Sequence, residues 1–194
     1  SAEVSGTTGA DDDNNGYVDD VHGINLIDPN ETPMDDHGHG THVAGIIAME
    51  NNNVGGVGIA YKSKIMPIKA GGSDGTLYSS DIAKGIEYAY KNGADVINMS
   101  FGSSAHSALI ENALQDAFNS CVLVAAAGND GIPTADCPLG GQNMYPASYS
   151  YVIGVMAYDE ANSFASFSNW DYKPNANAEY EVVSPGVSLY STFT

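Results

Sequence analysis

The chain has 194 residues, and its six Lys and Arg stand against 24 Asp and Glu, a formal net charge of −18. A nucleic-acid partner is therefore not expected, because phosphate binding needs Lys and Arg, and no run of about 18 apolar residues is present to span a membrane. The length fits a single domain, residues 1–194, that buries a sizeable core.

The N-terminal half begins without regular patterning. Residues 1–36 are rich in Asp, Asn, Gly and Pro and predict an acidic loop region, followed by an α/β core over residues 37–194. Apolar residues at 43, 44, 46 and 47 have helical spacing, so a helix is expected to begin near His39 or Thr41. Residues 65–70 predict a short strand.

The second predicted helix has signals at both ends. Ser79, Ser80 and Asp81 form an N-cap signal, and apolar positions 82, 86, 89 and 90 continue it with helical spacing. Asn92 and Gly93 supply the C-cap.

The C-terminal half alternates between strands and one more helix. Strands are expected at residues 94–100, 121–127, 151–157 and 181–184, and an amphipathic helix at 109–118. The continuous apolar run 121–127 predicts a strand buried on both faces. This alternation favours a mostly parallel central sheet with helices on both faces, and residues 131–149 predict a long irregular loop.

The two cysteines leave one question open. Cys121 opens the apolar run and Cys137 lies in the loop beyond it. The ends of such a strand are about 20 Å apart, so a disulfide needs the loop to fold back along the sheet. Otherwise the chain has one buried thiol and one loop thiol.

Two strand ends predict the location of a site, because parallel sheets bind ligands at the carboxyl ends of their strands. Residues 96–99 run into Ser100, Phe101 and Gly102, and residues 122–127 run into Gly128 and Asn129. Asn129 is either a functional amide beyond an apolar strand or a turn former, since Asn-Asp-Gly is favourable turn chemistry.

Three histidines, His37, His39 and His42, lie within six positions. They predict either a zinc site or one general base at a helix start with two structural neighbours. A base of this kind needs a carboxylate to fix its tautomer and a nucleophile to deprotonate.

Five segments in order resemble the subtilase family of serine proteases. Residues 39–45 (His-Gly-Thr-His-Val-Ala-Gly) resemble its active-site histidine motif, residues 96–102 its substrate-binding strand, and residues 125–129 its oxyanion-hole segment. Residues 145–147 and 184–187 match later landmarks of the family. The resemblance covers nearly the whole chain and implies a subtilisin-like three-layer α/β fold, incomplete at both ends.

The resemblance also implies roles for individual residues. His39 is implied as general base and acid, and Asn129 as the donor to the oxyanion, which favours the functional interpretation of Asn129. The implied substrate-binding residues are Ser100, Phe101 and Gly102 on the strand and Ala126, Ala127 and Gly128 at the P1 pocket. Tyr78 either lines a more distant subsite or is a surface aromatic at a helix end.

The aspartate and serine of the family's triad are not found in their family contexts. No Asp-Ser-Gly or Asp-Thr-Gly occurs, and neither Ser168 nor Ser191 has the nucleophile's context. We expect the aspartate before Ser1 and the serine after Thr194, so the chain alone is expected to be inactive. The alternative is a calcium-binding pseudoprotease or peptide-binding module without catalysis.

The acidic composition has two interpretations, a surface kept soluble by charge or a structural calcium site. Oxygen ligands recur at alternating positions in one loop: Asp11, Asp13, Asn15, the Tyr17 carbonyl and Asp19. The family resemblance implies a second loop, with the Asn52 side chain and the Glu50, Val54 and Gly56 carbonyls.

The family resemblance further implies a secreted, extracellular protein acting on protein or peptide substrates, with the flanking segments of its own precursor as further partners.

Overall fold

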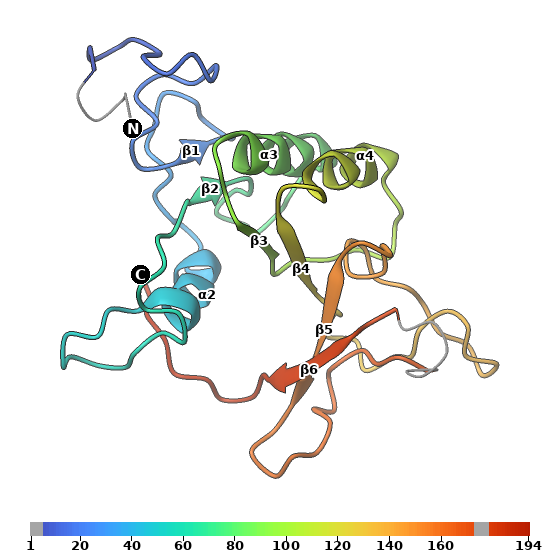
Figure 1. Cartoon of the computed structure of the whole chain (residues 1–194). Coiled ribbons are helices and arrows are strands. Elements are labelled where there is room, and N and C mark those ends of the chain that lie inside the picture. The colour runs from blue at the N-terminus through green and yellow to red at the C-terminus, as the bar shows by residue number, and fades with distance from the viewer. Residues whose placement is uncertain (1–5, 173–178) are drawn as a thin grey trace. The chain divides into compact units, whose positions relative to one another are not determined.

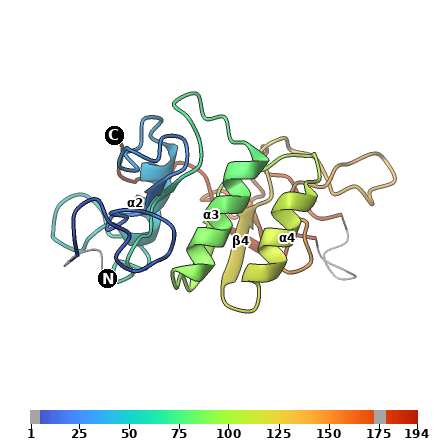
Figure 2. The ribbon, with the colours of Figure 1, turned by 90° about the horizontal axis from the view of Figure 1, so that it is seen from above.

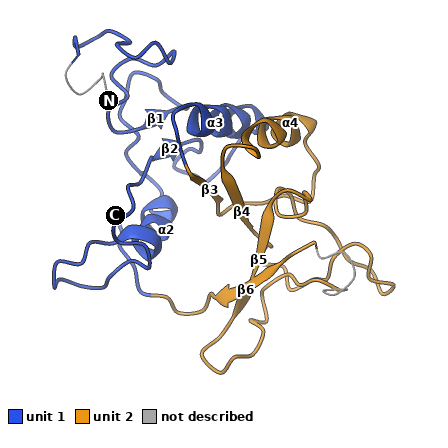
Figure 3. Ribbon diagram, viewed as in Figure 1, with its two compact units in different colours: residues 1–94, 190–194 blue, residues 95–189 orange. Residues whose placement is uncertain are grey.

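The computed structural model describes residues 6–172 and 179–194, so residues 1–5 of the predicted acidic loop region lie outside the described residues. The chain divides into two compact units (Figure 3). Unit 1 comprises Ser1–Ala94 and Tyr190–Thr194, and unit 2 comprises Asp95–Leu189. The prediction of one domain over residues 1–194 stays a prediction.

The described residues of unit 1 form two short parallel strands and two helices (Figure 1). These elements are β1 (Ile24–Asn25), α2 (His39–Ala48), β2 (Ile68–Lys69) and α3 (Ser79–Lys91). Strand β1 lies in the region predicted to be loop, and β2 is shorter than the predicted strand 65–70. Pro67 explains the shorter strand, because proline has no N–H to donate to the neighbouring strand. Its carbonyl still accepts a hydrogen bond from Ile24 N.

The N-cap of helix α3 lies one residue before the predicted cap signal, which began at Ser79. The N-cap is Tyr78, whose backbone is extended and whose carbonyl accepts from Asp81 and Ile82, so Ser79 and Ser80 already belong to the first turn. The predicted end is confirmed, since Asn92 is the C-cap and Gly93 follows with a φ of 80°.

Helix α2 matches the predicted helix and packs against the last residues of the chain. Ser191 Oγ donates to the His42 carbonyl at 2.5 Å, and Thr192 Oγ1 donates to the Thr41 carbonyl at 2.7 Å. Gly45 allows the Ser191 and Thr192 side chains to come close to the helix backbone. A Cβ at position 45 would lie 2.2 Å from Thr192 Oγ1 and 2.3 Å from Ser191 Oγ.

Unit 2 is a four-stranded parallel sheet in the order β3-β4-β5-β6. Its elements are β3 (Val96–Met99), α4 (Ala108–Ala117), β4 (Val122–Ala126), β5 (Ile153–Tyr158) and β6 (Val182–Pro185). Helix α4 connects β3 to β4 and lies beside β4 (Figure 2). The predicted parallel α/β organisation is confirmed in this unit.

Burial along β4 differs from the prediction. Leu123 and Ala125 are 1% and 2% exposed, whereas Val122 is 49% exposed, so burial alternates and the strand is not buried on both faces. Leu114 and Ala117 of α4 are fully buried and belong to the core. The loop 131–149 contains no helix or strand element, as predicted.

Two further predictions concern the cysteines and the membrane. Cys121 and Cys137 are both buried and neither forms a disulfide bond. Among residues 6–172 and 179–194, no helix has the length and apolar character needed to cross a bilayer.

The packing of α2 predicts opposite results for two glycines of that helix. We expect Gly45→Ala to lower the free energy of unfolding by about 1–3 kcal/mol, because the new methyl group overlaps Ser191 and Thr192. Gly40→Ala is the matched control. Its methyl group would come no closer than 3.6 Å to Asp35 Oδ2, and the alanine favours the helix by up to about 1 kcal/mol. Urea unfolding of both variants checks this, and equal effects would contradict the proposed packing role of Gly45.

Candidate active site

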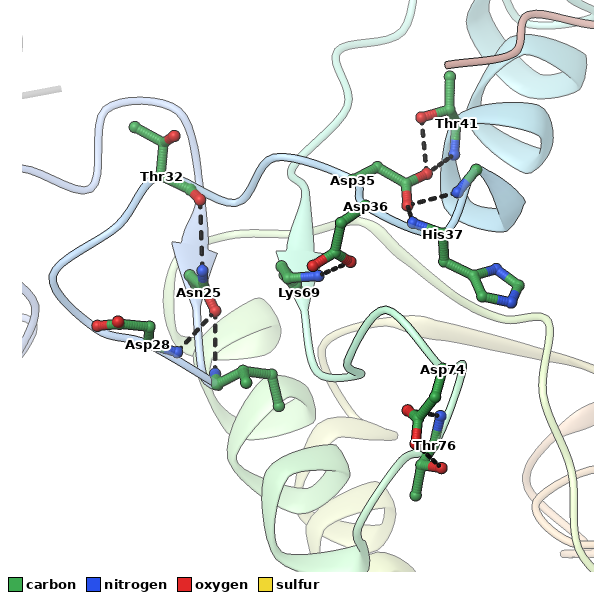
Figure 4. Close-up of polar contacts among 12 residues, drawn as sticks. Asn25, Asp28, Thr32, Asp35, Asp36, His37, Thr41, Lys69, Asp74 and Thr76 are labelled. Atoms are coloured by element: carbon green, nitrogen blue, oxygen red, sulfur yellow. Dashed lines mark hydrogen bonds and ion pairs between the residues drawn. The ribbon is translucent and has the colours of Figure 1, made fainter.

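His39 is the first residue of α2 and is exposed. The helix N-cap is Gly38, with a φ of 92° and no side chain to cap the free N–H groups of the first turn. Asp35 takes over this task from three residues upstream (Figure 4). One of its carboxylate oxygens accepts from His37 N and Gly38 N at 3.0 and 2.8 Å. The other accepts from Thr41 N and Thr41 Oγ1 at 2.8 and 2.7 Å.

These four bonds determine the charge state of Asp35. Desolvation acts to raise its pKa, but the bonds from Thr41, Gly38 and His37 outweigh it and hold the pKa well below its usual range. The carboxylate therefore stays ionised next to the positive end of the helix dipole. The sequence analysis assigned no role to Asp35. The signal it missed was an Asp upstream of a helix whose N-cap is glycine.

The two residues after Asp35 make separate contacts within unit 1. Asp36 forms an ion pair with Lys69 of β2. The His37 ring lies against the loop at Gly75, where a Cβ would be 3.0 Å from Nε2 (Figure 4). In that loop Asp74 accepts from Thr76 N and Oγ1, and these bonds lower the pKa of Asp74. The segment leading to His39 is thus anchored at three successive positions.

The zinc hypothesis for His37, His39 and His42 finds no support. The His37 and His39 rings lie 6.4 Å apart between centroids. Within the described ranges, no group of three or more His, Cys, Asp or Glu side chains is arranged to hold a metal ion.

Unit 2 brings the predicted substrate strand and the predicted oxyanion segment together. Strands β3 and β4 are in register with Met99 opposite Ala125, so both segments leave the same carboxyl edge of the sheet. A Cβ at Gly102 would lie 4.0 Å from the Ala126 carbonyl and 3.5 Å from Met144 Cε. Ser100 and Phe101 are half-buried, as are Ala126 and Gly128, whereas Ala127 is buried.

Asn129 follows this edge and is exposed. Gly128 before it has a φ of 105°, a backbone conformation that favours glycine. Among the described residues, no hydrogen bond from the Asn129 side chain is found, so its amide is available to a ligand. His39 and Tyr78 belong to unit 1, and Tyr78 is 65% exposed at the start of α3.

Both serines considered at the sequence level are engaged in structural hydrogen bonds. Ser168 is 3% exposed, accepts from Ala157 N and donates to the Asn169 carbonyl. Ser191 donates to the His42 carbonyl. Neither arrangement presents a hydroxyl to a general base.

In the first predicted calcium loop, the side-chain oxygens accept hydrogen bonds from nearby backbone N–H groups. Asp11 accepts from Asn15 N and Gly16 N, and Asp13 also accepts from Asn15 N. The Asn15 oxygen accepts from Tyr17 N, while Asp19 accepts from Gly9 N. No set of three or more acidic, His or Cys side chains converges here or elsewhere in the described part of the chain. A cation in this loop would therefore depend on amide and carbonyl oxygens as well as carboxylates.

The second predicted calcium loop has a similar internal arrangement. Asn52 N donates to the Glu50 carbonyl at 3.1 Å, and Asn52 Oδ1 accepts from Val54 N at 3.0 Å. A Cβ at Gly56 would lie 3.3 Å from Met49 Sδ, so the loop returns to the end of α2.

The role of Asp35 predicts a pH-dependent effect on stability. Asp35→Asn removes the charge and one of the two acceptor oxygens, so we expect the free energy of unfolding to fall by about 1–2 kcal/mol at pH 7. Because the folded pKa lies below the unfolded value of about 4, this stabilisation is present above that pH and is lost as pH falls through the folded pKa. Wild type and variant should therefore converge in acid.

Asp36→Asn is the control for this measurement. It breaks an ion pair with Lys69 in which the Asp36 side chain is 51% exposed, and pairs with a solvent-exposed partner contribute about 0–1 kcal/mol. Chemical unfolding at pH values from 2 to 7 checks both variants. A difference between wild type and Asp35→Asn that does not change with pH would contradict a role for the carboxylate.

Comparison with known proteins places this chain in a family. The model of the subtilase family matches residues 2–194. A thermophilic serine proteinase of Bacillus sp. (strain AK1) is 42% identical over 176 residues, which are 90% of this chain and 40% of that protein. Subtilisin DY of Bacillus licheniformis is 41% identical over 174 residues, which are 89% of this chain and 60% of that relative.

A solved structure agrees with these sequence relatives. The S41 psychrophilic protease superposes with a TM-score of 0.72 at 32% identity, covering 82% of this chain and 56% of its own. The likeness confirms the predicted subtilisin-like α/β fold. The chain spans 40% and 60% of the two curated relatives, and over that span its sequence, its fold and the family model agree. This chain belongs to the subtilase family.

Proposed function

We propose that this chain supplies the general base and the oxyanion donor of a serine endopeptidase. The observation that carries the proposal is the subtilase match over residues 2–194, a span that contains His39 and Asn129. The resemblance of their surrounding segments to the family's motifs supports these two residues. Both side chains are exposed, and each follows a structured anchor, Asp35 for His39 and strand β4 for Asn129.

The proposed chemistry divides the work between these two side chains. The His39 imidazole accepts the proton of the nucleophilic serine as its oxygen attacks the peptide carbonyl, and returns that proton to the leaving amine. The Asn129 amide donates to the negative charge that develops on the carbonyl oxygen. The serine, and the aspartate that orients the imidazole, come from sequence outside these 194 residues in this proposal.

The proposed substrate is an extended peptide. Ser100, Phe101 and Gly102 leave β3 at the sheet edge, where a peptide can add as a further strand through main-chain hydrogen bonds. Ala126, Ala127 and Gly128 have small side chains or none, which leaves room for a P1 side chain beside Gly102. Tyr78 is a candidate for a more distant subsite.

Activity measurements on the protein encoded by the whole reading frame test this proposal. We expect peptide hydrolysis and labelling by a serine-directed phosphonate, with His39→Ala abolishing both. Asn129→Ala should lower kcat by about 10²–10³-fold, a magnitude measured for this type of donor on a subtilisin and taken over unchanged.

His42→Ala is the matched control, because it removes a neighbouring imidazole of the same helix. It should leave labelling in place. Peptide binding that survives His39→Ala, together with no phosphonate labelling of the wild type, would contradict the endopeptidase and favour a peptide-binding pseudoprotease.

We also propose that calcium binds the loop containing Asp11, Asp13, Asn15, Tyr17 and Asp19, and that the protein is extracellular, as the family resemblance implies. The net charge of −18 supports the calcium proposal, because a bound cation relieves repulsion among clustered carboxylates. The loop at Asn52 is the second candidate.

Calcium should raise the free energy of unfolding by about 2.7 kcal/mol at a free concentration 100 times the dissociation constant. Asp11→Asn should reduce this gain. Asp159→Asn is the control, since Asp159 likewise accepts two backbone N–H groups in an acidic turn but lies outside both loops. Identical thermal unfolding in calcium and in a chelator would contradict the proposal.

A further inference from the structure

The loop that carries Asn129 needs an anchor outside itself. Residues 127–132 follow β4 outside the regular strands: Ala127 N donates to Val155 O of β5, Gly131 N donates to Phe167 O, and Ile132 O accepts from Trp170 N. Gly128 and Gly131 both adopt positive φ, 105° and 67°. Asn129 and Asp130 are exposed. An exposed loop with two glycines has large conformational freedom, so its shape depends on contacts made by neighbouring segments.

Asn169 contributes the side-chain part of those contacts from a distant part of the sequence. Its side chain is fully buried. The amide oxygen accepts from Asp130 N at 2.9 Å and from Ile132 N at 3.2 Å. The amide nitrogen donates to the Ala127 carbonyl at 3.0 Å, and Asn169 N donates to the Gly128 carbonyl at 3.0 Å.

These bonds enclose Asn129 without involving its side chain. Asn169 holds residues 127 and 128 before it and residues 130 and 132 after it. Gly128 is required for this approach, because a Cβ there would lie 2.5 Å from Asn169 Nδ2. Asn169 is itself secured, since its carbonyl accepts from Ser168 Oγ, which in turn accepts from Ala157 N of β5.

We propose that Asn169 is a positioning residue for the oxyanion donor: it fixes the loop 127–132 so that the Asn129 amide is held ready for the developing negative charge. Preorganisation of this kind saves reorganisation at the moment of reaction. The inference rests on the proposed role of Asn129. Sequence reasoning missed Asn169, because 40 positions separate it from Asn129 and no local pattern connects them.

A double-mutant cycle in the protein encoded by the whole reading frame tests the proposal. In the wild-type background, Asn169→Ala should lower kcat by about 10- to 100-fold with little change in KM, because a misplaced donor stabilises the transition state less. In an Asn129→Ala background, the same substitution should have little further effect, since no donor remains to be positioned.

Two further variants separate positioning from stability. Asn25→Ala is the matched control. Asn25 is also buried, accepts two backbone N–H groups and donates to a carbonyl, but it does so in the loop 25–32. It should lower the free energy of unfolding without the selective loss of kcat. Asn169→Asp is the second variant if the alanine does not fold, since it keeps an acceptor oxygen for Asp130 N and Ile132 N and loses the bonds that Nδ2 donates to the Ala127 carbonyl and to Asp130 Oδ2.

The outcomes distinguish this inference from the proposed function. If Asn129→Ala leaves kcat unchanged, the proposed oxyanion role fails. If Asn129→Ala lowers kcat but Asn169→Ala lowers it equally in both backgrounds, the positioning inference is overturned and the proposed function stands.

Amide hydrogen exchange gives a readout that does not depend on activity. The Asp130 and Ile132 amides should exchange faster in Asn169→Ala, while amides within β4 keep their protection. Unchanged exchange at Asp130 and Ile132 would overturn the inference by itself.

Discussion

The need to pair backbone polar groups governs the loops of this protein. Outside helices and sheets, an N–H group withdrawn from water needs another acceptor, and leaving it unpaired costs about 1–3 kcal/mol. Asp35, Asn25 and Asn169 each meet this need by accepting two or more backbone N–H groups with one short side chain. Two of the three act directly beside a residue implied in catalysis.

This arrangement separates the task of holding a loop from the task of chemistry. His39 and Asn129 are exposed, and hydrogen bonds with Asp35 and Asn169 hold the segments that carry them. The two anchors differ in kind. Asp35 relies on a charge next to a helix terminus, so its contribution depends on pH, whereas the amide of Asn169 does not titrate. Acid should therefore loosen the His39 segment before it affects the Asn129 loop.

Local patterns predicted the elements but not the anchors. Helical spacing correctly placed α2 and α4, and the alternation of helices and strands gave the parallel sheet. The N-cap of α3 was misplaced because Ser79 and Ser80 have strong cap propensity, while the chain uses the extended backbone of Tyr78. The continuous apolar run of β4 hid its alternating burial, since exposed Val122 looks like a core residue in sequence. Asn169 was beyond reach because its partners are set by tertiary contacts.

The contacts of Ser191 and Thr192 with helix α2 have a consequence for how the chain folds. Unit 1 is discontinuous: its residues up to Ala94 are separated from Tyr190 by the whole of unit 2. Ser191 and His42 lie 149 positions apart. Forming the contact between them therefore carries a loop-closure entropy cost. During synthesis, α2 leaves the ribosome long before the segment that covers Gly45. Unit 2 is local by comparison and can form first, with completion of unit 1 as a late, slow step.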